Sequence, residues 1–95
     1  MKTEKKGKSV TVTAGKDLSG KNSKEFIETM KELIAEGVTR FTLDFSNVEF
    51  IDTLSLSNLI IFCNMNELDF SFKNVHTTLK NLFDVLRLEK KVLYE

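Results

Sequence analysis

Apolar and polar residues alternate in three separate stretches of the chain, and each stretch predicts a β-strand with one buried face. The first is Ser9–Thr13, in which β-branched residues dominate. The second is Arg40–Phe45, which two polar residues separate from a further apolar run at 48–51. The third covers 68–73, where leucine and phenylalanine alternate with charged or hydroxyl side chains. The segment 92–94 predicts either a last strand or a packed tail.

Between the first two strands, apolar residues recur at helical spacing and predict an amphipathic helix. Asn22 and Glu25, three residues apart, resemble a capping box at its start. Gly37 supplies a left-handed stop at its end. The apolar stripe consists of Phe26, Ile27, Met30, Leu33 and Ile34.

Two more helices are expected further along the chain. One begins at Asp52-Thr53, either of which can cap it, and continues to the polar residues at 64–66. The alternation at 54–57 also resembles a strand, but the long apolar continuation without turn residues favours a helix. The other follows Thr77 or Thr78 as its cap. Their apolar stripes are Leu56, Leu59, Ile60 and Cys63, and then Leu79, Leu82, Phe83 and Leu86.

The order strand, helix, strand, helix, strand, helix with short connections predicts an α/β domain with a mixed, largely parallel sheet and helices packed against it. This domain is expected to span residues 9–95. Residues 1–8 carry four lysines and no apolar alternation, so they are expected to form a flexible, solvated basic tail. No apolar segment follows these lysines, which differs from a signal peptide, and the apolar run at 54–63 is half as long as a membrane helix.

Length and charge narrow the classes of function. The chain has 95 residues with 14 basic and 14 acidic side chains, which is enough for one small domain. A formal net charge of zero offers no basic surface for nucleic-acid phosphates. Cys63 is the one cysteine and lies in an apolar run, so we expect it in the core of a protein from the reducing cytoplasm.

The chain contains no convincing set of catalytic or metal-binding residues. His76 and Cys63 are far apart in sequence, whereas a zinc site needs three or four such ligands. The four glycines form no nucleotide-binding fingerprint, so no cofactor is expected. Asp44 and Asp52 flank a turn without an evident base, and solvated positions explain them better than acid–base catalysis. The sequence therefore favours a binding protein over an enzyme.

The most informative stretch is the predicted helix start at Asp52-Thr53. The simplest interpretation is that one of the two residues caps the helix. The same position also suits a phosphorylation switch, because the helix dipole and free N–H groups tolerate a phosphate that a docked partner does not.

These residues resemble the STAS domain, the fold of bacterial anti-sigma factor antagonists, over roughly residues 9–94. The segment 41–53 is similar to the strand, loop and Asp-Ser/Thr signature of the family, and 79–86 is similar to its third helix. The family usually has glycine where this chain has Ser55. It also commonly has two strands at its beginning, where this sequence predicts one clear strand.

The resemblance implies a cytoplasmic, non-enzymatic regulator that works by partner switching. It places the phosphorylation site on Thr53, with an anti-sigma factor that is also a serine/threonine kinase as partner and a phosphatase that resets the protein. The implied contact surface consists of Asp17, which lies near the family's Gly-x-x-Asp turn, together with Asp52, Leu54 and Ser55. Neither nucleic acid nor membrane insertion is implied. Some relatives instead serve as fixed subunits of lipid-transporting ABC systems or stressosome-like complexes, and this alternative stays open.

Overall fold

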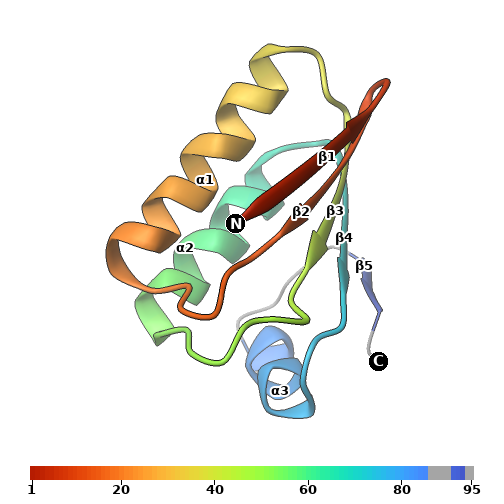
Figure 1. The fold of residues 1–95 in the computed structure, drawn as a ribbon. Helices are drawn as coiled ribbons and strands as arrows, with labels where there is room; N and C mark the ends of the chain where they lie inside the picture. Colours follow the sequence, from red (N-terminus) through yellow and green to blue (C-terminus); the bar gives the residue numbers. More distant parts are fainter. Residues whose placement is uncertain (86–90, 94–95) are drawn as a thin grey trace.

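The computed structural model describes residues 1–85 and 91–93, which form one sheet with helices on one side of it (Figure 1). Strands occur in the order β1-β2-β3-β4-β5 across the sheet. The β1 strand runs antiparallel to β2, and the remaining neighbours are parallel. This confirms the predicted α/β fold with a largely parallel sheet. The elements are β1 Lys2–Lys6, β2 Ser9–Thr13, α1 Gly20–Ala35, β3 Arg40–Asp44, α2 Thr53–Met65, β4 Asp69–Lys73, α3 Thr77–Val85 and β5 Lys91–Leu93.

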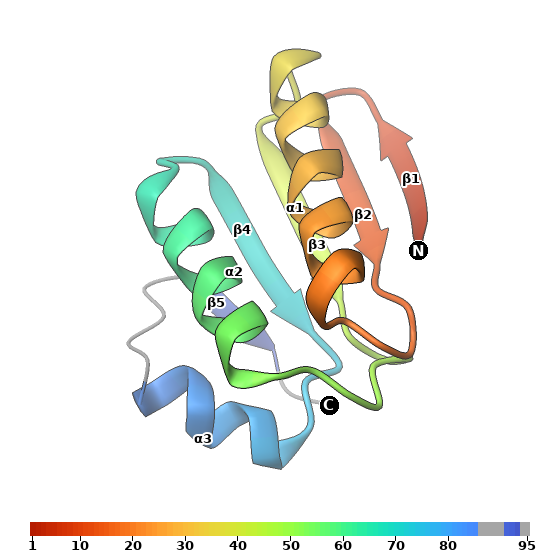
Figure 2. The same cartoon turned by 90° about the vertical axis from the view of Figure 1, so that its left-hand side faces the viewer.

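One face of the sheet is buried and the other is polar. Helices α1 and α2 cover the buried face, and α3 lies near the end at which β3 and β4 finish (Figures 1 and 2). Alternate residues of β2, β3 and β4 point toward the helices, as the period-two patterns predict. The buried side chains are Val10, Val12, Phe41, Leu43, Phe70 and Phe72, and the partly exposed ones on the opposite face include Thr11, Thr42 and Ser71.

Aromatic contacts dominate the core beneath the helices. The rings of Phe41 and Phe70, neighbours on β3 and β4, stack with their centroids 5.0 Å apart. Phe83 of α3 meets Phe72 edge to face at 5.2 Å, which attaches that helix to the sheet. Cys63 is buried in the same core, as expected.

Helix α1 begins earlier than predicted. Its first residue is Gly20, and Ser19 precedes it as the N-cap without a side-chain hydrogen bond to the N–H groups of the helix. The capping-box prediction for Asn22 and Glu25 is therefore wrong, because the Asn22 side-chain amide instead donates to the Asp17 carbonyl at 3.1 Å. The predicted stop at Gly37 is confirmed by a φ of +97°. The N–H groups of Gly37 and Val38 donate to the carbonyls of Ile34 and Leu33, which is the Schellman arrangement.

The later elements follow the sequence pattern closely. Helix α2 starts directly after Asp52 and extends to Met65, so the helical interpretation of 54–57 is confirmed. Helix α3 begins at Thr77 itself, and the His76 carbonyl accepts the N–H of Lys80, so neither Thr77 nor Thr78 acts as the predicted cap. Strand β5 shows that the terminal segment is a strand. Leu86 and Tyr94 lie outside the described residues.

The basic N-terminal segment is a strand and not a flexible tail. Residues Lys2–Lys6 pair with β2 over their full length, from Lys2 opposite Thr13 to Lys6 opposite Ser9. A two-residue turn joins the strands, and Gly7 adopts the positive φ of +64° that such hairpins require. All five β1 residues are exposed, so the strand has no apolar alternation by which the sequence would reveal it.

Substitution of a buried and of an exposed phenylalanine should have very different effects on the free energy of unfolding. Phe72→Ala should lower the free energy of unfolding by about 3–5 kcal/mol, because a fully buried ring with two aromatic neighbours leaves a cavity. Phe50→Ala should change it by no more than about 0.5 kcal/mol, because that ring is exposed. Urea unfolding of both variants measures this, and equal losses would contradict the assignment of Phe72 to the core.

Candidate functional site

The predicted site residues gather at the carboxyl ends of the parallel strands. The loop between β2 and α1 and the loop between β3 and α2 lie side by side there, next to the first turn of α2 (Figures 1 and 2). In open α/β sheets this edge is where ligands and partners usually bind, because the connections to the helices leave the strands at that edge.

A short backbone ladder holds the two loops together. The N–H groups of Glu49 and Phe50 donate to the Lys16 carbonyl at 2.8 and 3.0 Å, and Leu18 N–H donates to the Phe50 carbonyl at 2.8 Å. Asp17 and Phe50 thereby form an isolated parallel bridge. The apolar run at 48–51 is thus an extension of the sheet edge, and it fixes the loop that carries Asp17 beside the loop that leads to α2.

Asp17 is exposed but its own position is well defined. Its carboxylate accepts hydrogen bonds from the backbone N–H and the hydroxyl of Ser19. Its carbonyl accepts the Asn22 amide, so both ends of the residue are attached to the start of α1. The loop therefore presents a fixed negative charge on the surface.

Asp52 is the N-cap of α2. Its carboxylate accepts the Ser55 hydroxyl and the Ser55 backbone N–H, the latter at 2.8 Å, and these bonds lower the pKa of Asp52 below its usual value against a small opposing effect of burial. The carboxylate consequently stays ionised at neutral pH. Its bonds go to Ser55, so any effect on Thr53 passes through the geometry of the helix start.

Thr53 is the first residue of α2 and is exposed to solvent. Leu54 follows it with 71% of its surface exposed, and Phe50 precedes it with 58% exposed. All eight phenylalanines lie within the described residues 1–85, and Phe50 is the one among them that is exposed. Along the chain, an exposed threonine thus follows an ionised aspartate and is flanked by two exposed apolar residues.

Ser55 does not belong to the exposed surface. Only 5% of it is accessible, and its N–H and hydroxyl are both directed to Asp52. The expected contact of Ser55 with a partner stays a prediction, and in this geometry its side chain faces Asp52 and not the surface. A side chain at this position supplies a second hydrogen bond to the cap, which a glycine would not.

Phe50 is not among the site residues that the sequence predicts. The apolar run at 48–51 does not indicate which of its side chains face outward. A hollow of about 360 Å³ lies between this run and α3, with Phe50, His76 and Leu82 in its lining. The ladder between the loops turns Phe50 outward, and no local sequence signal distinguishes it from a core phenylalanine.

Asp44, the second carboxylate considered for chemistry, has a structural role. Partial burial would raise its pKa, but hydrogen bonds from the Asn74 amide and from Ser46, together with the Lys73 ammonium, outweigh burial and lower the pKa. Asn74 has a positive φ of +58°, so the bond fixes a tight turn after β4. His76 is exposed at the start of α3. Across residues 1–85 and 91–93 no three metal-binding side chains converge.

Comparison with known proteins identifies similar folds. A family model described as "Mlab, STAS domain" matches residues 1–94. The structure of the anti-sigma factor antagonist SpoIIAA in its unphosphorylated form superposes with a TM-score of 0.76 at 13% identity, covering 99% of this chain and 87% of that one. A candidate anti-sigma factor antagonist from Thermotoga maritima superposes with a TM-score of 0.80 at 18% identity, covering 99% and 86%. No curated protein matches.

Neither similar structure is close enough in sequence to transfer more than the fold. In the part of the chain that the structure describes, no helix has the length and apolarity that a bilayer crossing needs.

The hydrogen bonds of Asp44 predict a pH dependence of stability. Because its pKa is lowered from 3.8 by folding, its contribution to the free energy of unfolding is present above pH 3.8 and is lost as the pH falls through the lowered value. The difference in urea midpoint between wild type and Asp44→Asn should therefore be largest at neutral pH and shrink at lower pH. A difference that stays constant down to pH 2.5 would contradict this role.

Proposed function

Because this chain belongs to the STAS domain family, we propose that it is an anti-sigma factor antagonist whose binding to its partner is controlled by phosphorylation of Thr53. The observation that carries the proposal is the surface formed by Thr53, Leu54, Phe50 and Asp17, called the switch surface below. It combines a free hydroxyl at a helix N-terminus with apolar contact area. The fold that the chain shares with SpoIIAA, an anti-sigma factor antagonist, supports it.

Apolar side chains supply the attraction in the unmodified state. Leu54 and Phe50 gain free energy when a partner removes them from water, and exposed apolar groups surrounded by polar ones are typical of partner sites. The loop ladder and the Asp52 cap hold both residues in place before binding, so little conformational entropy is lost on association.

A phosphate on Thr53 makes binding of the partner unfavourable. It adds about −1.5 to −2 charges at the centre of the switch surface. The unfilled N–H groups of the first turn of α2 and the helix dipole stabilise the phosphate while it is solvated. A docked partner would have to bury this charge beside the ionised Asp52, which costs free energy because the charges repel and both lose water. The domain stays folded and the partner is released.

The partner in this proposal is an anti-sigma factor that also acts as the serine/threonine kinase, and a separate phosphatase restores the binding form. The chain itself is a substrate and not an enzyme, and the setting is the bacterial cytoplasm. Within the domain, Asp52 positions the start of α2 and Asp17 adds a fixed charge at the edge of the contact.

A second candidate function is the alternative that the resemblance to fixed-subunit relatives of the STAS family leaves open. In this alternative the domain is a permanent subunit of a larger assembly, such as a lipid-transporting ABC system, and Thr53 acts only as part of the helix start. The exposed Leu54 and Phe50 also suit such an interface, because permanent interfaces are more apolar than transient ones.

Three substitutions separate the two functions in a binding assay with the kinase partner and ATP. Phosphorylation should release wild type but not Thr53→Ala, and Thr53→Glu should bind at least about tenfold more weakly than wild type without ATP. Leu54→Asp should weaken binding by about 30-fold with or without ATP, because it places a charge in the apolar contact. Mass spectrometry of the protein from its native cells shows whether residue 53 carries a phosphoryl group.

The outcomes exclude one another. Release of the Thr53→Ala variant by ATP would contradict the switch. Unchanged binding by Thr53→Glu, together with lost binding by Leu54→Asp, would establish the permanent subunit instead. Val85→Asp serves as the matched control, since it places the same charge on an exposed apolar side chain outside the switch surface.

A further inference from the structure

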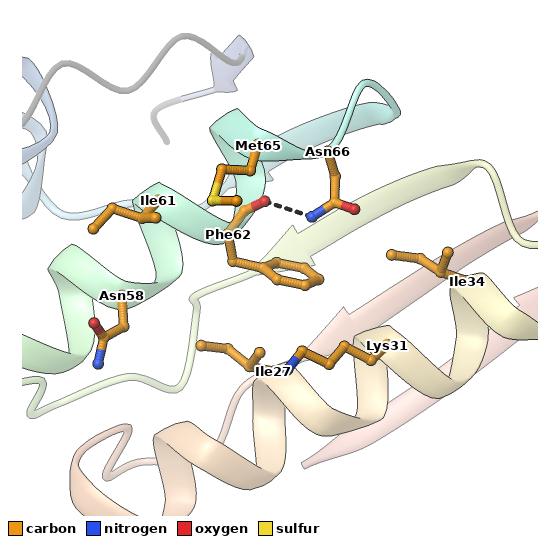
Figure 3. Close-up of a pocket in the computed structure, with 8 residues that line it drawn as sticks. All are labelled: Ile27, Lys31, Ile34, Asn58, Ile61, Phe62, Met65 and Asn66. Atoms are coloured by element: carbon orange, nitrogen blue, oxygen red, sulfur yellow. Dashed lines mark hydrogen bonds between the residues drawn. The ribbon is translucent and has the colours of Figure 1, made fainter.

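A groove runs between α1 and α2 on the side of the helices that faces away from the sheet (Figure 3). Its volume is about 500 Å³. The ring of Phe62 lies between the two helices and forms the floor, as Figure 3 shows. The apolar residues that line it are Ile27 and Ile34 from α1, and Ile61, Phe62 and Met65 from α2.

Two of these side chains are far more exposed than the fold requires. Ile61 is 54% exposed and Met65 is 76% exposed. The inner face of α2 already fills the core through Leu56, Leu59, Ile60 and Cys63, so the outer apolar residues add little to folding. A helix that is apolar on both faces, in a domain with one sheet, is expected to have something packed against its outer face.

We propose that an amphipathic helix of the partner protein lies in this groove, with apolar residues three and four positions apart and a carboxylate opposite Lys31. The proposal rests on the proposed function only in assigning the groove to the same partner that contacts the switch surface. A groove between two helices accepts a third helix through such apolar anchors.

The charge of Lys31 favours a docked helix that carries a carboxylate. Among the described residues that line the groove, Lys31 is the one with a charged side chain, and its amine extends along α1 toward Ile27 (Figure 3). Its existing partner, Glu28, lies 3.4 Å away with both side chains more than half exposed, so that pair contributes little. An acidic residue at the edge of a docked helix would meet the Lys31 ammonium in a drier setting, where the attraction is stronger.

The groove is continuous with the switch surface. Leu54, Asn58, Ile61 and Met65 are spaced at i, i+4, i+7 and i+11, which places them on one face of α2. A rise of 1.5 Å per residue separates Leu54 from Met65 by roughly 16 Å along the axis, the length of a three-turn helix. Phosphate at Thr53 therefore acts on one end of a longer contact.

Photocrosslinking from inside the groove tests the proposal in native cells. Benzoylphenylalanine at position 65, in the full chain carrying Thr53→Ala, should crosslink to a partner segment with apolar residues at helical spacing and an Asp or Glu. Using Thr53→Ala makes this result independent of phosphorylation. The matched control places the same group at Val85, which is 74% exposed at the end of α3, outside the groove, and should give no such crosslink.

A charge exchange then tests the position of the carboxylate. Lys31→Glu should weaken binding of the purified partner by about tenfold, and a lysine in place of the crosslinked acidic residue should restore it. Lys24→Glu, an equal charge change on an exposed part of α1 outside the groove, should have a much smaller effect.

Several results would overturn the proposal. The first is a crosslink from position 65 to a second copy of this chain or to lipid, or the absence of any crosslink. The second is an unchanged affinity for the partner in the Lys31→Glu variant. If Thr53 carried no phosphoryl group in native cells, the phosphorylation switch would be rejected, but the groove contact would still be measured by the crosslink and the charge exchange. Loss of both crosslink and charge effect with an intact switch would reject the groove alone.

Discussion

The whole domain depends on a single apolar layer between the sheet and the helices. Two rows of buried side chains, in register across β2, β3 and β4, form the sheet side of this layer. One row consists of Val10, Phe41 and Phe70, and the other of Val12, Leu43 and Phe72. Parallel strands need crossover connections, and here the helices of those connections supply the helix side. Helices α1 and α2 pack onto the sheet through this layer. Everything that they present outward is available for binding.

The position of the candidate site follows from the same arrangement. Helix α2 must start where β3 has ended, and the loop ladder through Lys16 and Phe50 brings the β2–α1 loop to the same edge. This end of the layer thus carries the charge of Asp17 from the β2–α1 loop, the ring of Phe50 from the β3–α2 loop, and Thr53 and Leu54 from the start of α2. No single element contains the site: the Asp52 cap is local, whereas the ladder between Lys16 and Phe50 joins segments distant in the sequence.

Much of this was accessible from the sequence, and the exceptions have physical causes. The strands over 9–13 and 40–45 and the cap at Asp52 could be predicted because burial of one face imposes a period and a helix start requires an acceptor. The β1 strand could not, because pairing of its backbone demands nothing of its exposed side chains. Likewise Asn22 was assigned to a cap, since its actual bond to Asp17 depends on a loop conformation. The outward turn of Phe50 depends on hydrogen bonds between segments distant in the sequence, whereas the Ser55 hydroxyl is directed to the Asp52 cap three residues before it.

The charges of β1 have a consequence for how the molecule behaves in a crowded solution. An edge strand carries unpaired N–H and C=O groups that can recruit the strands of other molecules and begin aggregation. Three lysines among five residues make such growth costly, because an incoming edge of the same kind would bring like charges together. The domain therefore keeps an open sheet edge without inviting polymerisation. The exposed lysines that made this segment resemble a solvated tail are the same residues that oppose pairing of the β1 edge with other molecules.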